Sequence, residues 1–369
     1  MTRTLHILGI RGLPAAHGGF ETFAEHLALH LVEKQWRVVV YCQERETGRI
    51  RYSEWNGVQR VHVPVGLAGV LGTILFDFIA VIHASRQKGL FLTLGYNTAL
   101  FNGLQRLRRQ VNLINMDGME WRRAKWGVVA KAWLWLNERA GCLIGNHLIA
   151  DHPMIAAHLG SRVASSKITM IPYGADEILD ADVSLIEALG LRPGQYSTVI
   201  ARPEPENSVL EIVQAFSRKH RAHVLVLLGI FSPDVNPYHR KVMDAASAEV
   251  LFPGAIYDSD VVRALRFFSR SYVHGHQVGG TNPSLVEALG AGCAVIAHDN
   301  RFNRWVAGPG AMYFKDESAC SALFDDLLSP DFSTAQMKEA SRRRFNEEFT
   351  WKQVLNEYEQ LLDSWHPRY

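Results

Sequence analysis

A glycine-rich loop that leads into a short helix holds the residues best suited to chemistry. The loop contains Gly279, Gly280, Thr281 and Asn282. Pro283 then fixes φ for a first helical position, and Asn282 is its predicted cap. A loop at a helix N-terminus presents free backbone N–H groups and the positive end of the helix dipole, which suits a phosphate. The pattern therefore predicts an anion site.

Glu287 lies about one turn into this helix, which we expect to run from about 283 to 289. A carboxylate there cannot help to bind phosphate, but it can accept hydrogen bonds from the hydroxyls of a neighbouring sugar. Phosphate donors beside a hydroxyl acceptor are typical of a nucleotide-sugar site. The alternative is a glycine-rich turn before an ordinary helix, with Glu287 solvated or salt-bridged on its surface.

Two other segments could approach an anion. Gly18 and Gly19 open a predicted helix over 20–35, and Arg202 follows a predicted strand over 196–201. Ligands bind beyond the carboxyl ends of strands in open α/β sheets, so Arg202 is a candidate diphosphate contact. The loop over 11–19 is not the GxGxxG dinucleotide fingerprint.

A cluster of charged and aromatic residues follows a predicted strand over 111–115. It contains Asp117 and Glu120, and three basic residues and two tryptophans accompany them in 116–126. Such a cluster at the carboxyl end of a strand indicates a functional edge of an α/β sheet. The alternative is a helix start capped by Asp117 with surface charges after it. His17, His147 and His276 are secondary candidates, because a lone histidine is more often a packed or surface residue.

These candidates must be positioned by two α/β domains. The strands over 4–10 and 37–42, with the helix between them, form a βαβ opening, and a second α/β run begins near 196. An acidic, loop-like boundary falls near 176–193, and a polar helical region over 334–363 is broken near 349–350. We expect a first domain over 1–178, a second over 179–349 and a final helix over 350–369.

Composition and charge agree with a chain of two domains. The chain has 369 residues, is 47% hydrophobic and carries a net charge of +2.

Charge is divided unequally along the chain. Residues 1–175 carry 20 Lys and Arg against 11 Asp and Glu, whereas 176–369 carry 19 against 26. A basic first half indicates an anionic partner such as a membrane surface or a lipid diphosphate. Dispersed cations and no recognisable motif argue against nucleic acid.

Three features that could suggest other classes of protein have ordinary interpretations. The apolar window over 63–82 contains Pro64, three glycines and Asp77, so we expect a loop and a buried or membrane-facing helix rather than a transmembrane span. The start of the chain predicts a strand rather than a signal peptide. Four scattered cysteines without metal-ligand spacing predict reduced core residues.

Several strings resemble glycosyltransferase family 4, which has the GT-B fold. HGGFET resembles the N-terminal Gly-Gly loop and helix of this family, IPYGAD its IPNGVD, ARPEPEN its GRLxPEKN, and VEALGAGCAVIA its LEAMAxGxPVIA. Four strings, HGGFET, NMDGMEWRRAKW, RPEPEN and HGHQVGGTNPS, resemble the rhamnosyltransferase-like branch of capsule and exopolysaccharide assembly. The resemblance implies two Rossmann-like domains facing across a cleft, with the C-terminal helix crossing back to the first.

The resemblance also implies an activity. It is retaining transfer of a sugar from a nucleotide diphosphate donor, typically dTDP-L-rhamnose, to a lipid-linked or oligosaccharide acceptor. It implies no metal and no cofactor. The reduced cysteines and the basic first half predict a cytoplasmic protein at the inner face of the plasma membrane. Cations and helix N-termini would stabilise the leaving diphosphate. Asp117 and Glu120 would orient the acceptor hydroxyl, and Glu287 would bind the ribose.

The sequence departs from the wider family at two positions. Many members carry a second glutamate eight residues before the one that matches Glu287, where this chain has Gly279. The lysine of PEKN is also missing, which leaves Arg202 as the close cation. Because of these two losses, a catalytically silent, membrane-associated scaffold of the same fold remains an alternative to an active enzyme. A nucleotide-sugar 2-epimerase shares the architecture, but RPEPEN and HGGFET do not resemble it.

Overall fold

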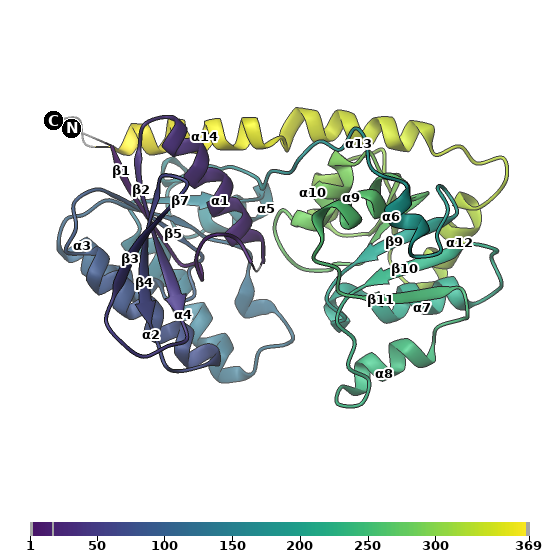
Figure 1. Cartoon of the computed structure of the whole chain (residues 1–369), viewed down its shortest axis with the longest axis horizontal. Helices are drawn as coiled ribbons and strands as arrows, with labels where there is room; N and C mark the ends of the chain where they lie inside the picture. Colours follow the sequence, from purple (N-terminus) through teal and green to yellow (C-terminus); the bar gives the residue numbers. More distant parts are fainter. Residues whose placement is uncertain (1–2, 17, 367–369) are drawn as a thin grey trace. The chain divides into compact units, whose positions relative to one another are not determined.

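The computed structural model describes residues 3–16 and 18–366, and His17 and the last three residues of the predicted final helix lie outside this part. The chain divides into two compact units (Figure 1). Unit 1 holds the residues up to Tyr173 together with those from Trp351 onwards. Unit 2 holds Gly174–Thr350. Each unit has its own sheet and its own buried core, as the composition predicted.

Unit 1 is built on an eight-stranded sheet in the order β3-β4-β2-β1-β5-β6-β7-β8. All neighbouring strands are parallel except β3 and β4, which form an antiparallel hairpin at one edge. The strands are β1 (Thr4–Leu8), β2 (Arg37–Glu44), β3 (Arg51–Trp55), β4 (Val58–Pro64), β5 (Leu90–Leu94), β6 (Asn112–Asn115), β7 (His147–Ala150) and β8 (Ile168–Met170).

The helices of unit 1 cover this sheet. They are α1 (Gly18–Glu33), α2 (Gly69–Ala84), α3 (Gly103–Leu107), α4 (Val128–Ile144) and α5 (Pro153–Gly160), with 3-10 turns η1 (Ala99–Asn102), η2 (Glu120–Arg122) and η3 (Ser165–Lys167). The apolar window over 63–82 forms the end of β4, a loop and most of α2, as predicted. Among the described helices, none is both long and apolar enough to cross a membrane.

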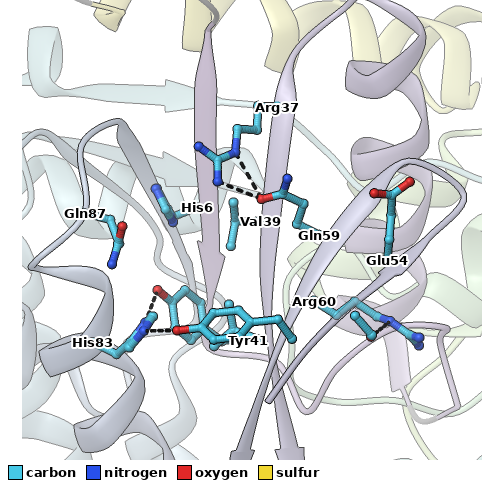
Figure 2. Close-up of a pocket in the computed structure, with 12 residues that line it drawn as sticks. His6, Arg37, Val39, Tyr41, Glu54, Gln59, Arg60, His83 and Gln87 are labelled. Atoms are coloured by element: carbon cyan, nitrogen blue, oxygen red, sulfur yellow. Dashed lines mark hydrogen bonds between the residues drawn. The ribbon is translucent and has the colours of Figure 1, made fainter. Parts of the chain in front are cut away.

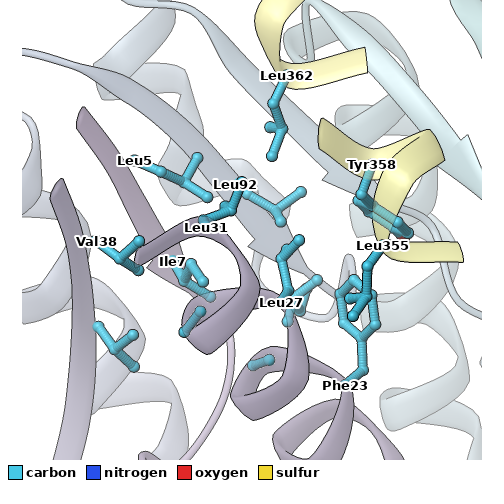
Figure 3. Close-up of a cluster of buried hydrophobic side chains, with 14 of the residues drawn as sticks. Leu5, Ile7, Phe23, Leu27, Leu31, Val38, Leu92, Leu355, Tyr358 and Leu362 are labelled. Atoms are coloured by element: carbon cyan, nitrogen blue, oxygen red, sulfur yellow. The ribbon is translucent and has the colours of Figure 1, made fainter. Parts of the chain in front are cut away.

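The last helix, α14 (Trp351–Trp365), packs in unit 1, which confirms the predicted return of the C-terminal helix (Figure 3). Its buried side chains Leu355, Tyr358 and Leu362 join one hydrophobic cluster with Phe23 and Leu27 of α1. The rings of Phe23 and Tyr358 lie 4.6 Å apart. The C-terminal end of α14 is also held by an ion pair, because Arg3 donates to Asp363 at 2.7 Å.

Unit 2 is built on a six-stranded parallel sheet in the order β11-β10-β9-β12-β13-β14. The strands are β9 (Tyr196–Ile200), β10 (Val224–Leu228), β11 (Val250–Gly254), β12 (Ser271–His274), β13 (Val295–His298) and β14 (Met312–Phe314). The helices are α6 (Ser184–Glu187), α7 (Val209–Ser217), α8 (Pro237–Asp244), α9 (Ser259–Phe267), α10 (Pro283–Gly290), α11 (Arg301–Ala307), α12 (Glu317–Leu327) and α13 (Ala335–Glu348), with the 3-10 turn η4 (Pro205–Asn207).

Candidate functional site

The glycine-rich loop of unit 2 connects the carboxyl end of β12 to the first residue of α10. Asn282 caps the helix as predicted, since its Oδ1 accepts from the backbone N–H of Ser284 at 3.2 Å. Gly279 has a φ of +142°, a conformation that favours glycine, and a Cβ added there would meet nothing within 4 Å. The loop therefore leaves space next to a helix N-terminus, where backbone N–H groups suit an anion.

Glu287 lies one turn into α10, and its carboxylate forms an ion pair with Arg266 of α9. The side chain of Arg266 is only 6% exposed, whereas that of Glu287 is 34% exposed. Arg266 thus brings a buried positive charge to the candidate ribose-binding carboxylate. The burial of Arg266 was not predicted from the sequence, because an arginine in an amphipathic helix is usually exposed.

The loop that carries Arg202 lies beside the glycine-rich loop, because β9 and β12 are neighbours in the sheet. Gln277 joins the two loops, since its backbone N–H donates to the carbonyl of Glu206 and its Nε2 donates to Ser208 Oγ, both at 2.9 Å. A Cβ added to Gly275 would lie 2.1 Å from the carbonyl oxygen of Asn207, so only glycine allows this approach. The exposed Arg202 forms no ion pair among the residues that the structure describes.

Two stacked histidines lie where β12 ends and the glycine-rich loop begins. The rings of His274 and His276 lie 4.3 Å apart and nearly parallel. His274 is buried, and within the described residues neither of its ring nitrogens has a hydrogen-bond partner. Burial, with the nearby His276 and His298, holds the pKa of His274 well below its usual value, so its ring is neutral at physiological pH.

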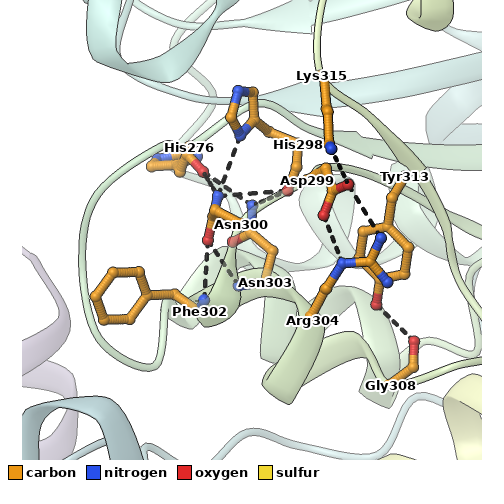
Figure 4. A network of polar contacts seen from close by, with 10 residues as sticks. All are labelled: His276, His298, Asp299, Asn300, Phe302, Asn303, Arg304, Gly308, Tyr313 and Lys315. Carbon is orange, nitrogen blue, oxygen red and sulfur yellow. Dashed lines mark hydrogen bonds and ion pairs between the residues drawn. The ribbon is translucent and has the colours of Figure 1, made fainter.

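A polar network fixes this loop to the segment after β13 (Figure 4). The carbonyl of His276 accepts from Asn300 Nδ2 at 3.0 Å and from the buried Asn303 Nδ2 at 2.9 Å. The Oδ1 of Asn300 also caps α11. Next to it, Asp299 forms an ion pair with Arg304. The loop between β12 and α10 is thus held in place by side chains that no motif in the sequence had indicated.

In unit 1, Asp117 and Glu120 follow β6, but their environments differ. Asp117 has a left-handed backbone with a φ of +48°, a strained conformation for a residue with a side chain. Burial, followed by the negative charges of Glu120 and Asp151, raises the pKa of Asp117 to about 7. Asp117 can therefore exchange a proton near neutral pH, which suits a general base or acid.

The carboxylate of Glu120 is bound by its own loop. Arg123 Nη1 donates to it at 2.8 Å and Trp126 Nε1 at 3.2 Å, while Lys125 Nζ lies 3.9 Å away. The backbone N–H of Glu120 donates to the hydroxyl of Tyr96 at 2.9 Å. These contacts indicate that Glu120 organises the loop around Asp117.

A cavity of about 410 Å³ lies near the start of α1, beyond the carboxyl ends of β1, β2 and β4. Its lining includes Arg11, Glu21, Arg45 and His62. The backbone N–H of Arg11 donates to Glu21 Oε1 at 3.2 Å, which ties the loop before α1 to the helix. Gly18 and Gly19 form the first residues of α1, but they do not line this cavity.

The two Rossmann-like units and the returning last helix define the GT-B fold of glycosyltransferases, and solved structures agree. Sucrose-phosphate synthase from Thermosynechococcus elongatus is similar, with a TM-score of 0.79, 16% identity and 98% of each chain covered. HepE from Anabaena, in complex with UDP and glucose, has a TM-score of 0.77 and 12% identity, covering 99% of this chain and 100% of that one.

A trehalose 6-phosphate synthase from Burkholderia multivorans is also similar, with a TM-score of 0.77, 11% identity and coverage of 99% of this chain and 97% of that one. Residues 2–176 match a family model described as a domain of unknown function, DUF1972. No curated protein sequence matches the chain.

Proposed function

We propose that this protein is a glycosyltransferase that binds a nucleotide diphosphate sugar in unit 2 and the sugar acceptor in unit 1. The observation that carries the proposal is the loop between β12 and α10, open at Gly279 and followed one turn later by the Glu287–Arg266 pair. The diphosphate would bind at the N-terminus of α10 and near Arg202, and the ribose would bind at Glu287. HepE, which shares the fold, was solved with UDP and glucose.

The proposed reaction is retaining and uses no metal. The leaving diphosphate gains negative charge in the transition state, and the helix N-terminus and Arg202 supply the opposite charge. Asp117, with its pKa near neutrality, orients the acceptor hydroxyl. Following the family resemblance, we propose dTDP-L-rhamnose as donor and a lipid-linked glycan of bacterial surface polysaccharide synthesis as acceptor.

The cavity beyond β1, β2 and β4, which Asp117 does not line, is proposed to hold the phosphates of the acceptor rather than its reacting hydroxyl. Arg11 and Arg45 line it and can bind the phosphates of a lipid-linked acceptor. Leu67 lines it as well, and the exposed Val70 and Leu71 follow at the start of α2. Cations beside exposed apolar side chains suit a molecule that joins a diphosphate to a lipid chain.

We further propose that unit 1 binds peripherally to the cytoplasmic face of an anionic membrane. Helices α2 and α4 both pack on η1. They expose apolar side chains, among them Leu71, Phe78, Val128, Val129 and Trp135. Arg139 stacks on the ring of Trp135 at 3.3 Å, and Arg122 and Lys125 precede α4. Apolar and aromatic side chains mixed with cations are typical of surfaces that bind anionic lipids.

Titration calorimetry with dTDP, UDP and GDP tests the donor site. The wild-type protein should bind at least one of them, and Arg202→Ala should weaken this binding by about 1.5–3 kcal/mol, as for a charged hydrogen bond. Arg192→Ala, which removes another exposed arginine of unit 2, should leave the affinity unchanged. The missing glutamate at Gly279 is also compatible with a catalytically silent scaffold. Such a scaffold should bind none of the three nucleotides.

A further inference from the structure

A second cavity, of about 380 Å³, lies in unit 1 on the face of the sheet that α2 covers (Figure 2). Arg37 is the first residue of β2 and Gln59 the second residue of β4, so the cavity extends from the amino ends of these parallel strands to their middle, at Tyr41. The candidate acceptor cavity lies beyond their carboxyl ends. The second cavity is therefore separate from that site, and its size is in the range of small-molecule sites.

One side of this cavity carries a positive charge. The Nε and Nη2 of Arg37 donate to Gln59 Oε1 at 3.0 and 2.9 Å. Glu54 also lines the cavity, but in the described part of the chain no carboxylate forms an ion pair with Arg37. A guanidinium held in place by a neutral amide keeps its full charge for a bound anion.

The opposite side is aromatic and hydrogen-bonded. His83, in the last turn of α2, lies 2.9 Å through Nδ1 from the hydroxyl of Tyr41 and 3.0 Å through Nε2 from that of Tyr52. Burial, with the nearby Arg86, lowers the pKa of His83, which favours the neutral ring. A neutral imidazole has one donor and one acceptor nitrogen, so the two hydroxyls satisfy both. Tyr52 is 69% exposed, and its ring is accessible to a planar ligand.

Unsatisfied polar groups surround the space between these two sides. In the described residues nothing accepts a hydrogen bond from Nε2 of the half-buried Gln59, and the exposed side chain of Gln87 has no protein partner, so both amides are free to contact a ligand in place of water. His6 is 4% exposed, and its Nδ1 likewise has no partner there. A buried polar atom without a partner, such as His6 Nδ1, calls for an explanation, and a bound polar ligand is one.

We propose that this cavity is a second ligand site, distinct from the nucleotide-sugar site, for a small molecule with a flat ring that carries a carboxylate or a phosphate. Arg37 binds the anionic group, the ring stacks on Tyr52, and the amides of Gln59 and Gln87 contact the polar edge of the ring. Because the cavity lies away from the carboxyl ends of the strands, the ligand would act as an effector rather than as a substrate.

Calorimetry with benzoate, phenyl phosphate and inorganic phosphate tests the proposal. Benzoate or phenyl phosphate, or both, should bind more tightly than inorganic phosphate. Comparing benzoate with phenyl phosphate shows whether the site prefers a carboxylate or a phosphate. Arg37→Gln should weaken binding at least tenfold, as expected for loss of a charged hydrogen bond. Arg49→Gln removes an exposed arginine outside the cavity and should have no effect.

Three further variants test whether the ring or the hydroxyl of Tyr52 matters, and whether the cavity is independent of the donor site. Tyr52→Ser should weaken binding, whereas Tyr52→Phe, which keeps the ring, should retain most of it. Arg202→Ala, in unit 2, should leave it unchanged whether or not the nucleotide-sugar proposal holds. The proposal is overturned if neither ring anion binds, if Arg37→Gln binds like the wild type, or if Arg202→Ala abolishes binding.

Discussion

Individual residues of the candidate site combine buried charge with partial access to solvent. Arg266 is almost fully buried, and its ion-pair partner Glu287 is the more exposed member of the pair. The spacing of Glu287 from the glycine-rich loop was readable in the sequence because it follows from helix geometry alone. Arg266 was not, because the pairing depends on how α9 and α10 pack and no local pattern encodes that contact.

The pair with Arg266 determines how a substitution of Glu287 will behave. Glu287→Gln should weaken nucleotide diphosphate binding by about 1.5–3 kcal/mol through loss of a charged acceptor. It should also lower the free energy of unfolding, because a buried cation then lacks its carboxylate. The double variant Arg266→Met/Glu287→Gln removes the unpaired cation, so it should recover stability without recovering affinity. Calorimetry and urea unfolding measure the two effects, and recovered affinity would contradict a ribose contact.

Asp117 gives a prediction that depends on pH. Its folded pKa is about 7, whereas an unfolded aspartate ionises near 3.9. Between about pH 4 and 7 the unfolded chain releases this proton and the folded chain retains it, so stability should fall as pH rises through this window. Asp117→Asn stays neutral, so at pH 8 it should be more stable than the wild type by roughly 1–3 kcal/mol, with little difference at pH 4.

The same variant should transfer sugar more slowly, because the carboxylate that is proposed to orient the acceptor hydroxyl is gone. Greater stability combined with lower activity is the pattern expected of a strained catalytic residue. Asp180→Asn, at an exposed carboxylate of unit 2, should change neither property. An Asp117→Asn variant that is less stable than the wild type at pH 8 would show that the carboxylate is a structural residue.

At the scale of elements, most helices and strands around the candidate sites could be predicted from periodicity and capping residues. The hairpin of β3 and β4 was missed, although Asn56 and Gly57 have the positive φ values of a tight hairpin turn. Asn-Gly between alternating residues is a strong local signal for such a turn. The contacts between loops could not be predicted, because their partners are distant in sequence. Gln277 donates to the hydroxyl of Ser208, and Asn300 and Asn303 donate to the carbonyl of His276.

The contact between the Arg202 loop and the glycine-rich loop can be tested at Gly275. Gly275→Ala places a Cβ 2.1 Å from the carbonyl oxygen of Asn207 and 2.7 Å from Ile212 Cδ1, so the loops must separate. We expect a loss of about 1–3 kcal/mol in stability and weaker nucleotide diphosphate binding. Gly160→Ala, where a Cβ meets nothing within 4 Å, is the control. Unchanged nucleotide affinity would show that the contact between the two loops does not shape the site.

At the scale of the whole molecule, charge is divided unequally along the chain. The first 175 residues have nine more basic than acidic side chains, and the remainder has seven more acidic ones. The two-unit fold and the returning helix were predicted correctly from the family resemblance. The exposed apolar residues of α2 and α4 could not be assigned to the surface from the sequence, because an apolar helix is compatible with burial on every side.

Membrane binding should follow from this charge and this apolar surface together. Vesicles rich in phosphatidylglycerol should sediment the protein at low salt and release it at high salt, since salt screens the attraction. Val129→Asp should reduce sedimentation, because it places a carboxylate on the proposed binding surface. Val235→Asp, at an exposed apolar residue of unit 2, should not. Absence of sedimentation at every salt concentration would exclude the proposed association.

The place of α14 in unit 1 has a consequence for how the chain is made. Because α14 follows all of unit 2 in sequence, the ribosome synthesises unit 2 before the core of unit 1 can close. Until then Phe23 and Leu27 lack the side chains that cover them, whereas unit 2 is one continuous segment and can fold as soon as it emerges. During synthesis, unit 1 therefore exposes apolar surface for longer than unit 2. Unit 1 is the part of the nascent chain that most needs a chaperone.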